Sequence, residues 1–181
     1  MDRLFIAISL PLQVKNAVAD AQLQIKDQMK NSNVTWVAPE NFHVTLHFLG
    51  DVEEWEKGHL IIASHEKDYP TAFEMKLTGV SAFPNKKNPR TLFVDTTMHP
   101  SLLGVRKRIA DVLLEHEFRI DTRKWASHIT VGRVKDRAEV LQPEKIKVEP
   151  VKFTVVSFDL ISSTLGPEGS IYEVVETFPL T

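Results

Sequence analysis

The amino-acid sequence predicts an α+β fold built around a largely antiparallel sheet. Strand-like and helix-like segments follow in the order β-α-β-α-β-β-α-β-β-β, without the strict alternation of a doubly wound fold. Two segments rich in turn-forming residues, 83–89 and 162–170, join neighbouring strand-like runs as hairpin connections would. With 181 residues, of which 43% are hydrophobic, the chain is long enough to bury one core.

In the first half of the chain, apolar spacing and turn residues mark the expected elements. Residues 4–8 form a short apolar run that is typical of a central strand. The apolar positions of 11–30 fall at helical spacing. Residues 43–50 have the composition of a strand, and a helix over 52–67 follows, with Asp51 as its expected N-cap.

The second half contains more strands than the first. A helix is expected over 100–116, because its apolar residues repeat with helical spacing. Strands are expected over 73–80, 90–96, 126–134, 151–162 and 170–178.

The charge and composition of the chain limit the kinds of partner that it is expected to bind. The formal net charge is −2, whereas a protein that follows a long nucleic-acid backbone usually has a large excess of basic residues. Any nucleic-acid substrate is therefore expected to be held locally, at an end. The sequence has no cysteine, no signal-peptide pattern and no apolar stretch of membrane-spanning length, so we expect a soluble cytoplasmic protein that does not engage a membrane.

The stretch HVTLHFLG, residues 43–50, places polar residues inside a strand that otherwise looks buried. Strict alternation puts one set on a core face and another on the opposite face: Val44, Leu46 and Phe48 against His43, Thr45 and His47. The motif returns as HITV at 128–131, 85 residues later and again on an expected strand that follows a helix. One His-x-Thr is weak evidence, because a lone histidine is usually structural. Two copies in the same phase indicate two similar halves with a shared site.

The repeated motif suggests acid–base chemistry on an anionic group. If the two strands lie side by side, His43 and His128 can flank one reacting group, one taking a proton and the other giving one. The hydroxyls of Thr45 and Thr130 can then donate hydrogen bonds to an oxygen that gains negative charge. These four side chains describe a centre that cleaves phosphodiesters without a metal.

A metal site is the rival interpretation, and strand geometry disfavours it. His43 and His47 would be neighbours on a helix, but on a strand they lie roughly 13 Å apart, at ~3.3 Å per residue. No acidic residue is expected on the same face. We therefore expect no metal, and we interpret His47 as a structural residue or one at the edge of the site.

Arg133 and three aromatic residues are further candidates. Arg133 would be a suitable phosphate ligand, but strict alternation places it on the face opposite His128. It reaches the His128 face only if Gly132 permits a β-bulge, or if the strand ends there and the side chain swings back. Phe48 is a candidate for stacking on a nucleobase, as are Trp36 and Tyr172. A solvated surface position is the alternative for Arg133, and core packing is the alternative for the aromatic residues.

These motifs together resemble the RNA 2′,3′-cyclic phosphodiesterases, also called 2′-5′ RNA ligase-like or LigT-like proteins, of the 2H phosphoesterase superfamily. The resemblance extends over nearly the whole chain and rests on RLFIAISLP, VTWVAPENFHVTLHFLGDV, FPNKKNPRTLFV, SHITVGRV and SSTLGPEGSIYEV. One departure is Gly132, where the family more usually has alanine.

The resemblance implies one domain, 1–181, made of two similar lobes: two largely antiparallel sheets flanked by helices, with pseudo-twofold symmetry and a central cleft. It also implies opening of an RNA 2′,3′-cyclic phosphate to a 2′-phosphate, without cofactor or metal, and reversible 2′-5′ ligation. His43 and His128 would be catalytic, whereas Thr45, Thr130 and Arg133 would bind substrate. Phe48 is added to the expected substrate-binding residues for its aromatic ring, not on the resemblance. The family pattern suggests His43 as the acid and His128 as the base, but the residues alone leave that assignment open.

The expected partners are RNA ends or cyclic nucleotides, and the chain is expected to be a monomer. Two alternatives stay open on the sequence. One is a phosphodiesterase for a small cyclic nucleotide. The other is a non-catalytic module that binds phosphorylated RNA ends through the histidine pair.

Overall fold

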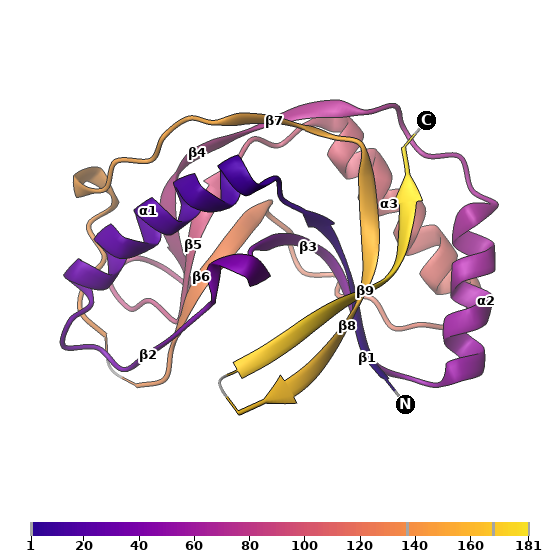
Figure 1. Cartoon of the computed structure of the whole chain (residues 1–181), viewed down its shortest axis with the longest axis horizontal. Coiled ribbons are helices and arrows are strands. Elements are labelled where there is room, and N and C mark those ends of the chain that lie inside the picture. The colour runs from indigo at the N-terminus through magenta and orange to yellow at the C-terminus, as the bar shows by residue number, and fades with distance from the viewer. Residues whose placement is uncertain (1, 137, 168, 181) are drawn as a thin grey trace.

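The computed structural model describes residues 2–136, 138–167 and 169–180 (Figure 1). Three α-helices lie in this part of the chain: α1 (Leu12–Gln28), α2 (Glu54–His65) and α3 (Pro100–Glu115). Nine strands accompany them: β1 (Asp2–Ser9), β2 (Val34–Trp36), β3 (His43–Val52), β4 (Phe73–Phe83), β5 (Thr91–Thr96), β6 (His128–Val134), β7 (Lys152–Val155), β8 (Ser157–Gly166) and β9 (Gly169–Pro179). The predicted α+β class is confirmed, and every pair of strands in the part of the chain that the structure describes is antiparallel.

Three details differ from the sequence prediction. The short strand β2 was not expected, and it pairs with β6. The single strand expected over 151–162 is two strands, because β7 pairs with β4 whereas β8 pairs with β1 and β9. Asp51 does not cap α2: it lies in β3 opposite Arg3, and the N-cap is Glu53.

The nine strands follow a path that has two similar halves. The order is β7-β4-β5-β6-β3-β1-β8-β9, with β2 added at β6. The halves β7-β4-β5-β6 and β3-β1-β8-β9 meet at the centre, where Val44 of β3 pairs with Ile129 of β6. The two strands that carry the repeated His-x-Thr motif are therefore the two central strands of the sheet.

One large core lies between the sheet and the helices. It joins side chains of α1 and α3 to alternate residues of the central strands, such as Val44, Leu46, Ile129 and Val131. A smaller apolar cluster of Phe5, Ala7 and Ile161 is separate from this core, with Tyr172 packed against it. The β8–β9 hairpin projects beyond the rest of the sheet (Figure 1).

Each long helix contacts the central strand of the opposite half. Helix α1 follows β1, yet its Gln22 side chain bonds the Val131 carbonyl of β6. Helix α3 follows β5, yet its Arg106 side chain bonds the Leu46 carbonyl of β3. The crossed helices therefore link the two halves behind the central strands. In the described part of the chain, none of the helices is long and apolar enough to cross a membrane.

Candidate active site

The two motif histidines lie on adjacent strands and are held in the same way. His43 and His128 are half-buried, and the residues that follow them, Val44 and Ile129, are paired across the β3–β6 junction. The Nδ1–H of His43 donates to the Asn41 carbonyl and that of His128 donates to the Ala126 carbonyl, each at 2.7 Å. These bonds fix the neutral tautomer, so that Nε2 is the free nitrogen of each ring.

The threonine two residues after His43 contacts that free nitrogen. Thr45 Oγ1 lies 2.9 Å from His43 Nε2. Because the Nδ1 of His43 carries the proton, the Thr45 hydroxyl donates and Nε2 accepts. Thr130 is the corresponding residue of β6, half-buried like Thr45 and on the His128 face of its strand.

A β-bulge after each motif threonine changes which residues share a face of the strand, compared with strict alternation. In β3, Thr45 pairs with Ala7 and His47 with Ile6, so Leu46 is the extra residue. The phase changes there: His47 is buried, with 4% of its surface exposed, whereas Phe48 is 63% exposed. The prediction that Phe48 lies on the core face is therefore wrong, because it ignored the bulge. Phe48 shares the face of His43 and Thr45.

A β-bulge at the equivalent place in β6 decides on which face of the strand Arg133 lies. Thr130 pairs with Phe93 and Gly132 with Leu92, which leaves Val131 as the extra residue of β6. Val131 and Gly132 are both buried, and Arg133 is exposed. Of the two explanations that the sequence left open, the structure has a bulge, with Val131 and not Gly132 as its extra residue, and this bulge brings Arg133 to the face that carries His128 and Thr130.

Side chains from the crossed helices hold both bulges from behind. Gln22, which is 2% exposed, donates from Nε2 to the Val37 and Val131 carbonyls at 2.7 and 2.8 Å. On the other half, Arg106 Nε donates to the Leu46 carbonyl at 3.3 Å. Leu46 and Val131 are the extra residues of the two bulges, so each bulge carbonyl has a side-chain donor.

Trp125 and His47 complete the support of β3. Trp125 Nε1 donates to the Thr45 carbonyl at 3.2 Å, and the Arg106 guanidinium lies over the Trp125 ring at 5.0 Å. His47 Nε2 donates to the Arg106 carbonyl at 3.0 Å. The interpretation of His47 as a structural residue is confirmed by its burial and this bond.

Gly132 is required by close packing against β2. A Cβ atom at this position would lie 2.9 Å from two ring carbons of Trp36 and 2.9 Å from Val34 Cγ1. Trp36 and Val34 therefore fill the space that a side chain at this position would need. Its partners place Trp36 against the core and away from the histidine pair.

Aromatic rings flank both histidines. The His43 ring lies 4.9 Å from that of Phe5 and 5.5 Å from that of Tyr172, measured between centroids. The His128 ring lies 5.0 Å from that of Phe93 and 5.2 Å from that of Phe83. These rings exclude water from the sides of each imidazole. Only Tyr172 among them was singled out from the sequence, since the others become neighbours through strand register.

Burial and charge lower the pKa of both histidines. For His43, burial lowers the pKa most, the bond to the Asn41 carbonyl opposes it, and the positive charges of His128, Lys15 and Arg133 lower it further. For His128, burial again dominates and the Ala126 carbonyl opposes it, while Asp95 raises the pKa and Arg133 lowers it. The positive charge of Arg133 thus lowers the pKa of both rings.

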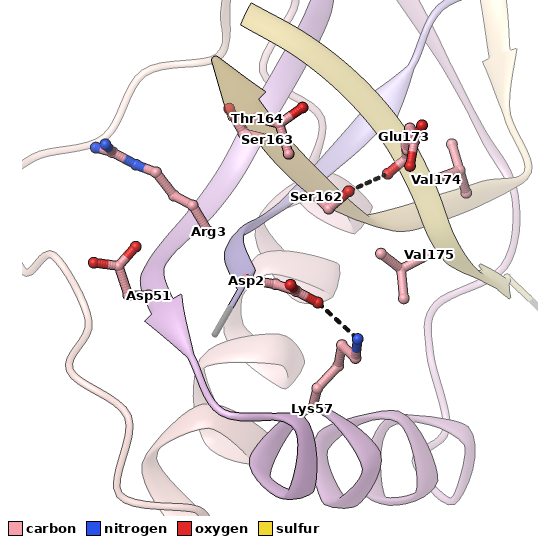
Figure 2. Close-up of a pocket in the computed structure, with 10 residues that line it drawn as sticks. All are labelled: Asp2, Arg3, Asp51, Lys57, Ser162, Ser163, Thr164, Glu173, Val174 and Val175. Carbon is pink, nitrogen blue, oxygen red and sulfur yellow. Dashed lines mark hydrogen bonds and ion pairs between the residues drawn. The ribbon is translucent and has the colours of Figure 1, made fainter. Parts of the chain in front are cut away.

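The described residues offer no obvious metal site. No group of three or more His, Asp or Glu side chains among them is placed to share an ion. A separate polar hollow, drawn in Figure 2, lies near the start of β1 and includes Asp2, Arg3, Asp51 and an Asp2–Lys57 ion pair of 2.7 Å. Asp2 pairs with Val52 whereas His43 pairs with Ser9, so this hollow and His43 lie at opposite ends of the β1–β3 pair.

The chain is similar to proteins of one family over nearly its whole length. Residues 8–93 match the family model described as LigT like Phosphoesterase. An RNA 2′,3′-cyclic phosphodiesterase of Thermotoga maritima is 33% identical, over 96% of this chain and 92% of that protein. Its counterpart in Methanocaldococcus jannaschii is 32% identical, over 96% and 98%.

Solved structures agree with this relationship. The crystal structure of TT0787 of Thermus thermophilus has a TM-score of 0.83 and 30% identity, and the match covers 98% of this chain and 97% of that one. Apo LigT of E. coli has a TM-score of 0.79 at 21% identity, covering 99% and 98%, which supports the fold alone. The chain belongs to the LigT-like phosphoesterase family.

Proposed function

We propose that this protein is a metal-independent RNA 2′,3′-cyclic phosphodiesterase that opens the cyclic phosphate to a 2′-phosphate by two-histidine acid–base catalysis. The observation that carries this proposal is the pairing of the two His-x-Thr motifs on the central strands, with both Nδ1 atoms tied to backbone carbonyls. The relatives named above as RNA 2′,3′-cyclic phosphodiesterases support the substrate class.

The proposed roles follow from the chemistry of each side chain. One imidazole removes a proton from water and the other protonates the departing ribose oxygen, at Nε2 in both cases. Thr45, Thr130 and Arg133 bind the phosphate oxygens, where charge builds up as the fifth bond to phosphorus forms. Phe48, exposed at the edge of the same face, stacks on the terminal base. With a 5′-hydroxyl end as the nucleophile in place of water, the same opening of the cyclic phosphate would join the two ends through a 2′-5′ linkage, and that ligation would be reversible.

The direct test is incubation with an RNA that ends in a 2′,3′-cyclic phosphate, followed by identification of the phosphate position. We expect a 2′-phosphate, and we expect equal rates with and without EDTA. A 3′-phosphate product would contradict the proposed geometry, and loss of activity in EDTA would contradict the metal-independent mechanism. Binding without turnover would instead favour an RNA-end binding module.

The same assay on small substrates separates the remaining alternative. Near-neutral net charge favours recognition of an end and not of a long backbone. If an RNA end is the substrate, kcat/KM on a cyclic-phosphate oligonucleotide should exceed that on a cyclic mononucleotide. A higher value on the mononucleotide would identify a small-nucleotide phosphodiesterase.

A further inference from the structure

Each motif histidine has a buried and an exposed phenylalanine ring near it. On one side, Phe5 is 3% exposed and packs against His43, and its ring lies 6.1 Å from that of Phe48, which is 63% exposed. In the half that contains β6, Phe93 is 3% exposed and its ring lies 4.4 Å from that of Phe83, which is 40% exposed. Both halves of the sheet therefore present an exposed aromatic ring that rests on a buried one.

Strand register places Phe83 on the face that carries the site. Phe83 of β4 pairs with Thr91 of β5, and Thr91 pairs with Arg133 of β6. Opposed residues of an antiparallel pair point to the same face, so these three side chains form a row across the sheet. The Phe83 ring lies 5.2 Å from that of His128 and at 86° to it. With strands about 4.8 Å apart, a nucleoside over Phe83 would stay within reach of a phosphate bound by Arg133.

Displacement at phosphorus needs space on both sides of the phosphate. The attacking and departing oxygens lie roughly in line through phosphorus. When a 5′-hydroxyl opens the cyclic phosphate, the departing oxygen belongs to the nucleoside that carries the phosphate and the attacking oxygen to a second nucleoside. The two nucleosides therefore lie on opposite sides of the phosphate, one beside each histidine. Hydrolysis has only water on the second side and needs one aromatic ring, whereas this protein has two.

We propose that Phe83 binds the base of a second nucleoside, the 5′-hydroxyl end of an RNA strand, on the His128 side of the phosphate. The base next to the cyclic phosphate stays with Phe48. This proposal rests on the proposed function and names a second substrate of the same site. It agrees with the order that the family resemblance suggests, because His43 then lies beside the 3′ oxygen and His128 beside the attacking oxygen.

The step that uses this second nucleoside is balanced. Its 5′-hydroxyl gives a proton to one histidine as its oxygen forms a bond to phosphorus. The bond from phosphorus to the 3′ oxygen breaks, and that oxygen takes a proton from the other histidine. The product is a 2′-5′ phosphodiester with a free 3′-hydroxyl, and no water is consumed. In the reverse direction the 3′-hydroxyl displaces the 5′ oxygen and the cyclic phosphate is restored.

The first test measures binding without turnover. The ligand is 3′-deoxyadenylyl-(2′→5′)-adenosine, which has two nucleosides and lacks the 3′ oxygen that would attack phosphorus. The comparison ligand is the methyl ester of 3′-deoxyadenosine 2′-phosphate, which has the same charge and a single nucleoside. By titration calorimetry, we expect the ligand with two nucleosides to bind roughly 5- to 100-fold more tightly, as for one stacked base.

Substitutions assign this gain in affinity to the Phe83 ring. Phe83→Leu should remove most of the gain, because leucine keeps an apolar side chain against Phe93 but has no flat ring to stack on. Phe83→Tyr should keep the gain. Phe48→Leu should weaken the binding of both ligands equally, because both contain the base that Phe48 is proposed to contact. Trp55→Leu, at a 66% exposed position of α2, is the control and should change neither affinity.

Equal affinities of the wild type for the two ligands would overturn the proposal, as would a gain that Phe83→Leu keeps or Phe83→Tyr loses. Near-native urea midpoints would show that a loss does not arise from unfolding. Absence of turnover on cyclic-phosphate RNA would end the proposed function, yet calorimetry would still report whether Phe83 binds a second base.

The second test follows the partition between joining and hydrolysis. An RNA with a 2′,3′-cyclic phosphate is incubated with a second RNA that has a 5′-hydroxyl end, and both products are quantified. Phe83→Leu should lower the ratio of 2′-5′ junctions to 2′-phosphate ends by about tenfold, within the range for one stacked base. Phe48→Leu should slow both reactions and leave the ratio unchanged.

Two results of this assay would overturn the proposal. One is a wild-type protein that hydrolyses the cyclic phosphate and forms no junction. The other is a ratio that Phe83→Leu leaves unchanged because both products fall together, which would show that the ring acts only through His128.

Discussion

Phe48 and Arg133 occupy equivalent positions on the two central strands. Each lies five residues after its motif histidine and directly after a β-bulge, and each is exposed on the face that carries the histidine. An aromatic ring therefore stands at one end of the site where a guanidinium stands at the other. Because the backbones match and the side chains differ, we expect Phe48 to contact the base and Arg133 to contact the phosphate.

Arg133→Ala should lower kcat/KM, because Arg133 is proposed to bind the phosphate group of the substrate. We expect kcat/KM on a 2′,3′-cyclic nucleotide to fall by about 10²-fold, as for loss of one donor to developing charge. Arg133→Lys should recover only part of this, because an ammonium group lacks the planar fork. Arg108→Ala, on the exposed surface of α3, is the matched control and should retain the wild-type rate. Equal losses in both Ala variants would argue against a specific role.

Phe48→Ala should affect binding of the base and little else. We expect KM for a cyclic nucleotide to rise by roughly 5- to 100-fold, the equivalent of about 1–3 kcal/mol of stacking. Ribose 2′,3′-cyclic phosphate, which has no base, should show no such change. Trp55→Ala removes another exposed aromatic ring, 66% exposed on α2, and serves as the control. A similar loss on the base-free substrate would contradict the stacking role.

Replacement of either motif histidine should abolish activity and preserve the fold. His43→Ala and His128→Ala should each reduce kcat by about 10²–10⁴-fold, because each removes one proton-transfer group. His59→Ala, at an exposed position of α2, should have wild-type kinetics. Circular dichroism and urea midpoints would check folding. Substantial turnover by a folded His43→Ala or His128→Ala protein would exclude the two-histidine mechanism.

Gly132→Ala should destabilise the protein through Trp36. The new methyl group would lie 2.9 Å from the ring, and overpacking of this kind costs about 1–3 kcal/mol in the free energy of unfolding. Gly79→Ala is a matched control, because a Cβ at that strand position meets no atom within 4 Å. In a Trp36→Leu background the cost of Gly132→Ala should shrink. An unchanged cost there would show that Trp36 is not the cause.

Stability should decrease as the pH falls below about 6.5, the ordinary pKa of histidine. Burial lowers the pKa of His43, His47 and His128 in the folded protein. The unfolded chain therefore binds more protons than the native state in this range, so the stabilisation present above that pH is lost as the pH falls. Urea midpoints between pH 8 and 5.5 would measure it.

His47→Gln should reduce this pH dependence and retain a donor for the Arg106 carbonyl. His116→Gln removes an exposed histidine and is the control, expected to leave the slope unchanged. A slope in His47→Gln equal to that of the wild type would mean that His47 does not stay neutral in the folded protein.

The fold class and the histidine pair could be predicted from local sequence. Strand and helix periods are properties of consecutive residues, and a motif repeated on two expected strands signals two matching halves. The predicted element boundaries were wrong where pairing with strands distant in the sequence decided the structure. Asp51 is in a strand because β1 pairs as far as Val52, and residues 151–162 divide because their two parts join different halves of the sheet.

By itself, the sequence singled out the residues that are proposed to carry the chemistry: His43, Thr45, His128 and Thr130, with their shared spacing. Only the tertiary structure decided which way Phe48 and Arg133 face, because a bulge depends on the register of the neighbouring strand. It also decided that Asp95 stands beside His128 and Ser9 beside His43. The two residues of each pair are distant in sequence, and only the folded sheet places their side chains next to each other.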